Sequence, residues 1–66
     1  MLRAIEVRNT EDGHTCIVFV PQIVCIEAVG KASRIHLTNG KYVSVAESHE
    51  SVLSRVEIAA LGEDGR

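Results

Sequence analysis

The chain has 66 residues, the size of one small domain. Its 7 basic and 9 acidic residues give a net charge of -2 and are spread without a basic stripe. A nucleic-acid-binding protein normally carries such a stripe to neutralise phosphates, so this class is disfavoured. The composition includes no Trp, one Phe and one Tyr, and the core must therefore come from Val, Ile, Leu and Ala.

A chain of this length buries only about 60% of the surface that its unfolded form exposes, so its stability is marginal. Small domains compensate with disulfides, a metal or self-association. We find no signal peptide and no stretch with the ~20 apolar residues of a membrane span. Two cysteines without a leader indicate a reducing compartment, and we expect a cytoplasmic protein in which Cys16 and Cys25 are buried, unreactive thiols.

Alternating and β-branched residues predict strands over most of the chain up to Val45. The segment 2–8 alternates between apolar and polar side chains, which is typical of a half-buried strand. The segments 15–20 and 23–28 are apolar on both faces and therefore need cover on both sides. A fourth strand, 33–37, forms a hairpin with the residues that follow Gly40.

Turn residues separate these strands. Asp12 and Gly13 favour a tight reversal with a positive φ at the glycine. Pro21 excludes a two-residue hairpin between the second and third strands, and a wider turn with Pro21 at its second position is expected. A further turn falls at 30–32.

The hairpin around Asn39 and Gly40 allows its register to be argued from burial. A two-residue loop would place the valines after Tyr42 on the polar side of the sheet. A three-residue loop, 38–40, pairs Leu37 with Lys41 and puts the apolar residues on one face, which the burial of a single face requires. We therefore predict the three-residue loop, with Gly40 in the left-handed region, an apolar face of Ile35, Leu37, Val43 and Val45, and a polar face of Arg34, His36, Tyr42 and Ser44.

A helix is predicted from about 49 to 61, with Ser48 as its N-cap and Glu50 in the first turn. Gly62 is suited to end it, and 63–66 are expected to fray. Apolar residues recur at helical spacing at Val52, Leu53, Val56, Ala59 and Ala60. We expect them to pack on the apolar face of the hairpin, so that Leu53→Asp would prevent folding.

The fold class predicted from these elements is α+β: one domain, 1–62, with a small antiparallel β-meander of four to five strands and one C-terminal helix. The few residues that could bind a metal or act as nucleophiles do not pair at the spacing of zinc ligands. We therefore predict no catalytic residue, no cofactor and no metal, with solvated histidines at His14, His36 and His49. Glu27 interrupts an apolar strand, and it either points to solvent at a bulge, which we favour, or blocks edge-to-edge pairing.

Three short patterns follow one another along the chain. They are I-x-x-I-E at Ile23, Ile26 and Glu27, L-x-N-G-K at Leu37, Asn39, Gly40 and Lys41, and Val45, Glu47 and Ser48 before Val52. In this order the chain resembles very short bacterial flagellar-operon proteins of the FlbD/SwrD type, over nearly its whole length and at turn, core and capping positions. The resemblance implies a non-enzymatic accessory role in motility and no catalytic residues. The two cysteines and a longer segment from Gly13 to Val20 depart from that pattern.

A weaker resemblance is to the β-rich DNA-binding module of LytTR response regulators, through I-x-x-I-E-A and the turn that follows. That module is longer and basic, whereas this chain is neither. The leading hypothesis is therefore a small non-enzymatic interaction or regulatory protein, and the alternative is a nucleic-acid-binding regulatory module. An enzyme is disfavoured because general acid–base or nucleophilic chemistry needs a positioned pair in a cleft.

Self-association is predicted from an excess of apolar faces over elements to cover them. One short helix covers only one face of a small sheet, and contiguous apolar patches are rarely left open on soluble monomers. The predicted partner is a second copy of the chain, in a closed symmetric dimer. We expect its interface to include Ile17, Phe19, Val24 and Ile26.

Overall fold

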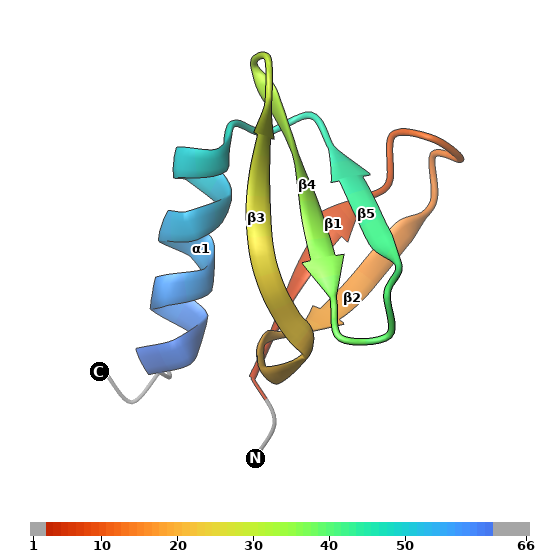
Figure 1. Ribbon diagram of the computed structural model, residues 1–66. Coiled ribbons are helices and arrows are strands. Elements are labelled where there is room, and N and C mark those ends of the chain that lie inside the picture. The colour runs from red at the N-terminus through yellow and green to blue at the C-terminus, as the bar shows by residue number, and fades with distance from the viewer. Residues whose placement is uncertain (1–2, 62–66) are drawn as a thin grey trace.

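The computed structural model describes residues 3–61, which form five strands, a 3-10 turn and one helix (Figure 1). In chain order these are β1 (Ala4–Arg8), β2 (Thr15–Phe19), the 3-10 turn η1 (Val20–Gln22), β3 (Ile23–Val29), β4 (Ala32–Leu37), β5 (Tyr42–Val45) and α1 (His49–Leu61). The predicted α+β class is confirmed. The predicted C′ residue, Gly62, and the predicted frayed tail, 63–66, lie outside the described residues.

The strands divide between two antiparallel sheets, where the sequence indicated one meander. β1 pairs with β2, and the second sheet has the order β3-β4-β5. The division falls at η1, where Pro21 stands at the second position of a turn that Ile23 N–H closes by donating to the Val20 carbonyl. This is the wider turn expected from the fixed φ of proline. It redirects the chain, so that β3 begins a new sheet instead of pairing with β2.

The register of the β4–β5 hairpin is the predicted one. Ile35 lies opposite Val43, and Leu37 N–H donates to the Lys41 carbonyl at 2.8 Å across the three-residue loop. Gly40 has a φ of 84°, in the left-handed region that glycine adopts without a steric penalty. As expected from this register, Ile35, Val43 and Val45 are buried on one face.

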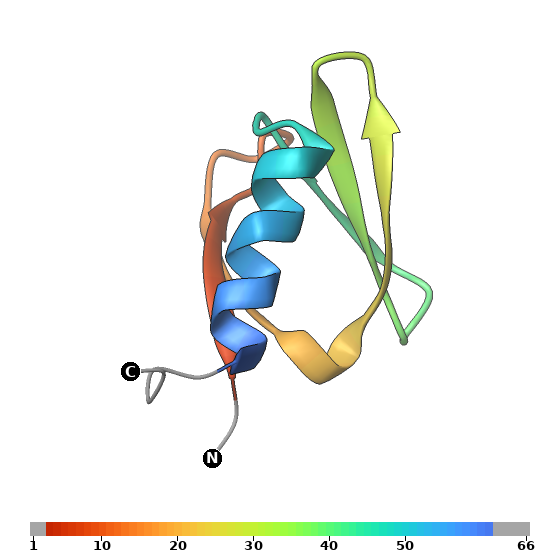
Figure 2. The ribbon, with the colours of Figure 1, turned by 90° about the vertical axis from the view of Figure 1, so that its left-hand side faces the viewer.

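The core lies between the two sheets. The β1–β2 hairpin packs over the three-stranded sheet (Figures 1 and 2). It contributes Ile5, Val7 and Val18 to the same cluster that contains Ile35 and Val52. This hairpin is a second covering layer that the sequence did not indicate. The apolar face of the sheet is therefore covered by two elements, with the hairpin over β5 and the helix over β3 and β4.

The helix packs with a different stripe of residues from the one predicted. Val52 is fully buried, and Val56 and Ala59 pack against the core, but Leu53 is 47% exposed and Ala60 is exposed. The prediction that Leu53 is buried was therefore wrong. α1 contacts β1, β3 and β4, so it lies between the edges of the two sheets instead of across one sheet (Figure 2). In this position the helix buries the stripe formed by Val52, Val56 and Ala59, and Leu53 lies beside that stripe on the uncovered side.

Adjacent substitutions in α1 test this orientation. Val52→Asp would bury an unpaired carboxylate at a cost of several kcal/mol, comparable to the roughly 3–10 kcal/mol expected for the stability of a domain this size. We expect it to abolish cooperative unfolding. Leu53→Asp should change the free energy of unfolding by no more than about 1 kcal/mol, because exposed positions tolerate charge. Urea titration followed by circular dichroism compares the two, and an unfolded Leu53→Asp variant would contradict the orientation.

Candidate functional site

An apolar groove runs between β3 and α1, and we call it the β3–α1 groove. Its volume is about 350 Å³, and its lining is Ile23, Val24, Cys25, Ile26, His49, Leu53 and Val56. Ile26 and Val56 reach from it into the core, while Val24 is 64% exposed and forms the rim opposite Leu53. A groove of this size accommodates one or two aliphatic side chains.

A bulge explains how Val24 and Cys25 come to line this groove. The pairing of β3 with β4 shifts between Ile23 and Cys25, so the alternation of side chains along β3 is interrupted there. Cys25 is consequently exposed, and Cys16 on β2 is only half-buried. The prediction of two buried thiols was wrong at Cys25, because the bulge turns this part of the strand away from the core.

A second apolar surface lies on the outer side of β2. Ile17 and Phe19 are 57% and 42% exposed there, because the alternate residues Cys16 and Val18 face the core. The two exposed side chains border a pocket of about 300 Å³ that extends inward to Leu37. We call this area the β2 surface.

The predicted interface residues therefore fall on two surfaces. Ile17 and Phe19 belong to the β2 surface, whereas Val24 and Ile26 line the β3–α1 groove. Ile26 is half-buried, since it also packs against the core. The sequence predicted all four in one interface, but it did not show that the two strands belong to different sheets.

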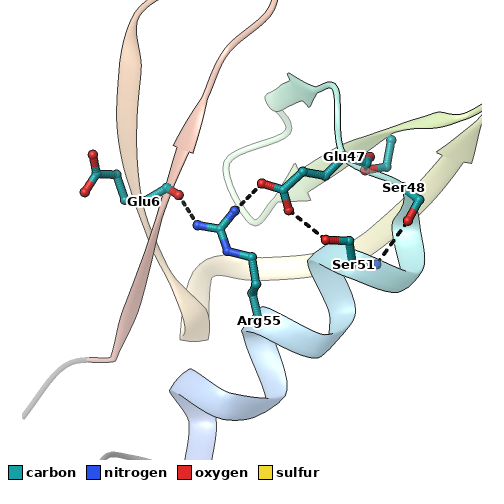
Figure 3. Close-up of polar contacts among 6 residues, drawn as sticks. Glu6, Glu47, Ser48, Ser51 and Arg55 are labelled. Atoms are coloured by element: carbon teal, nitrogen blue, oxygen red, sulfur yellow. Dashed lines mark hydrogen bonds and ion pairs between the residues drawn. The ribbon is translucent and has the colours of Figure 1, made fainter.

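A polar clasp joins α1 to β1 on the side of the helix away from the groove (Figure 3). The Arg55 guanidinium donates to the Glu47 carboxylate and to the backbone carbonyl of Glu6 in β1. Ser51 Oγ donates to the same carboxylate at 3.2 Å, and the Ser51 N–H donates to Ser48 Oγ, which confirms the predicted N-cap. The guanidinium thus donates a hydrogen bond to a carbonyl at the edge of β1, and this bond fixes the helix beside that strand.

The sequence did not identify this clasp. Arg55 stands three residues after Val52 and borders the buried stripe. That position was a usable signal that its aliphatic stem packs at the margin of the core. The carbonyl that it meets is 49 residues away and leaves no mark in the sequence.

Charged and aromatic residues gather on the open face of the three-stranded sheet. Glu27 Oε1 accepts a hydrogen bond of 2.9 Å from His36 Nε2 and lies 3.8 Å from Arg34. The Arg34 guanidinium lies 5.0 Å from the centre of the Tyr42 ring. Glu27 therefore points to solvent, as favoured, but within a cross-strand ion-pair cluster and not at a bulge. The Glu27 carboxylate is thus paired with the Arg34 guanidinium and hydrogen-bonded to the His36 imidazole.

The described residues bring no metal-binding set of side chains together. Among residues 3–61 no three His, Cys, Asp or Glu side chains lie close enough to hold a metal ion, and the His14 imidazole lies 3.8 Å from the Asp12 carboxylate. The same part of the chain contains no helix with the length and hydropathy of a membrane span. What these residues offer is apolar surface and an exposed strand edge.

Comparison with protein-family models, curated proteins and solved structures finds no match to this chain. The likeness to FlbD/SwrD-type flagellar-operon proteins therefore stays a prediction.

The ion-pair cluster predicts a measurable titration. The hydrogen bond from His36, with the positive charge of Arg34, lowers the pKa of Glu27 below its ordinary value of 4.5. Because this folded-state pKa is depressed, the cluster stabilises the fold above pH 4.5, and that contribution is lost as the pH falls through the folded-state pKa.

Carbon-13 NMR titration of the Glu27 carboxyl should show the pKa rising toward 4.5 in His36→Ala. His14→Ala, which removes an imidazole paired elsewhere, is the matched control and should leave the Glu27 curve unchanged. Identical curves in His36→Ala and the parent would contradict the assignment.

Proposed function

We propose that this is a small non-enzymatic interaction protein that forms a homodimer through the β2 surface. The observation that carries the proposal is the pair of large side chains, Ile17 and Phe19, that β2 exposes beside an apolar pocket. Exposed aliphatic and aromatic residues beside a pocket are typical of the anchors of protein interfaces. A cytoplasmic accessory role, including one in motility as the family resemblance implies, agrees with an interaction protein of this kind.

The size of the molecule favours an interface that includes β2. A stable interface takes about 800 Å² from each partner, and the accessible surface of this chain is 4442 Å². The interface would therefore occupy roughly a fifth of the molecule, which is most of one side. The side formed by β2 combines exposed apolar residues with a sheet edge, and both are stabilised by contact with a second copy.

Sedimentation of Phe19→Lys tests the dimer. The parent should sediment at twice the 7.2 kDa chain mass at micromolar concentration, and the lysine should dissociate it because a charge would be buried in the interface. Tyr42→Lys is the matched control, since Tyr42 has the same 42% exposure but lies on the open face of the other sheet. A 7.2 kDa parent, or an unchanged mass for Phe19→Lys, would disprove the proposal.

Nucleic-acid binding is the second candidate, and the Arg34–Tyr42–His36 cluster is the observation in its favour. Stacked aromatic and guanidinium groups on an open sheet face can hold unpaired bases. Glu27 opposes this reading, because its carboxylate already pairs with Arg34, the cationic group that a phosphate would need.

A gel-shift assay at low salt separates the two functions. Even weak phosphate binding is detectable under these conditions. We expect no shift of single-stranded RNA or DNA, because the Glu27 carboxylate pairs with Arg34. A shift that salt and Tyr42→Ala both abolish would make nucleic-acid binding the leading function.

A further inference from the structure

The edges of the two sheets differ in what occupies them. On β5, the Ser44 carbonyl accepts a hydrogen bond of 2.8 Å from Thr10 N–H. On β1, the Glu6 carbonyl accepts from Arg55. Within the described residues β3 pairs only with β4, and its other edge borders the β3–α1 groove. An unprotected strand edge is a template for another strand.

The turn before β4 determines which backbone groups of β3 point to that edge. Val29 and Ala32 flank a two-residue turn that begins with Gly30 at a φ of 60°, and such flanking residues form a hydrogen-bonded pair. Pairs along an antiparallel ladder alternate between bonded and non-bonded. Ile26 and Ala28 are therefore non-bonded positions, and their N–H and C=O groups point away from β4.

The helix beside the groove carries negative charge around its exposed apolar residue. Glu50, Leu53 and Glu57 recur at i, i+3 and i+7, which aligns them as one stripe, and all three are exposed. Arg55, the one Arg or Lys of α1, is engaged in the clasp on the opposite side, while His49 lines the groove one turn before Leu53. A ligand that reaches Leu53 thus meets two carboxylates separated along the helix by about 10 Å.

We propose that β3 binds an extended segment of a partner protein, which adds as a strand with the pattern basic-x-aliphatic-x-basic; the inference rests on the proposed function as an interaction protein. The aliphatic side chain enters the groove against Leu53. The two basic residues, which lie on the same face because strand side chains alternate, extend to Glu50 and Glu57. Their spacing of about 13 Å along a strand matches that of the carboxylates within the reach of Lys or Arg.

The packing of the helix favours a lone segment over a second copy of the chain. α1 lies alongside β3 (Figures 1 and 2). Its Val56 packs against the core on the inner side of the sheet. A copy paired β3 to β3 about a two-fold axis would bring its own α1 to the same side of the joined sheet. Paired strands are about 4.8 Å apart, whereas packed helices need 8–10 Å between their axes. A peptide has no helix to accommodate.

Fluorescence anisotropy with a defined peptide tests the proposal. The probe is fluorescein-labelled Thr-Lys-Val-Leu-Val-Lys-Thr, and its controls replace both Lys by Glu or the central Leu by Asp. We expect saturable binding of the probe and at least ten-fold weaker binding of each control. Bound probe should also slow iodoacetamide labelling of Cys25, which lines the groove, but not of Cys16 on β2.

Two variants of α1 provide the matched comparison. Leu53→Lys places a cation at the groove and should weaken binding at least ten-fold, whereas Ile58→Lys makes the same change at an exposed position of α1 outside the groove lining and should not. Equal binding to both variants, or no binding to the parent, would overturn the proposal. A Leu53→Lys variant that sediments at half the parent mass would do so too, because a second copy would then fill the groove.

The peptide-binding test and the dimer test can fail independently of each other. Probe binding by a monomeric parent would remove only the proposed homodimer. A dimeric parent that ignores the probe would remove only the peptide site.

Discussion

The fold depends on a single 13-residue helix that closes the gap between two small sheets. Val52 from that helix and Ile35 from β4 have no exposed surface and belong to the one core cluster. The two-stranded sheet is at best marginally stable alone, and the three-stranded sheet has an apolar face that must be covered. Burial of Val52 therefore joins the hairpin, the three-stranded sheet and the helix in one core. It also sets the orientation of α1, and this orientation determines which side chains of the helix stay exposed.

The two sides of α1 are unequal because helical residues advance by about 100°. With Val52 buried, Ser51 and Arg55 turn toward β1, where the chain supplies a carbonyl and a carboxylate as partners. Leu53 turns toward β3, where it meets only the groove. The clasp thus fixes the helix against one sheet and leaves an apolar opening along the other.

Local features of the chain were predictable where a single residue type constrains the backbone. Gly40 and the alternation around it were sufficient for the β4–β5 register, and Ser48 marked the start of α1. Leu53 was misassigned because helical spacing defines a broad apolar stripe and does not show which margin is covered. That margin depends on the β1–β2 hairpin, whose position over the other sheet is a long-range property. Cys25 was misassigned because the bulge beside it shifts the alternation on which the prediction relied.

The β2 surface and the β3–α1 groove lie on different sheets. β1 lies between β2 and α1, since it pairs with β2 on one side and is clasped by α1 on the other (Figures 1 and 3), while η1 joins the end of β2 to the start of the groove at Ile23. A dimer formed through the outer side of β2 that does not extend over η1 would present two β3–α1 grooves. Two linked weak sites bind a partner with repeated segments far more tightly than either alone, because the second contact forms at a high effective concentration. A chain too small for a large interface could in this way gain affinity from self-association instead of from additional surface.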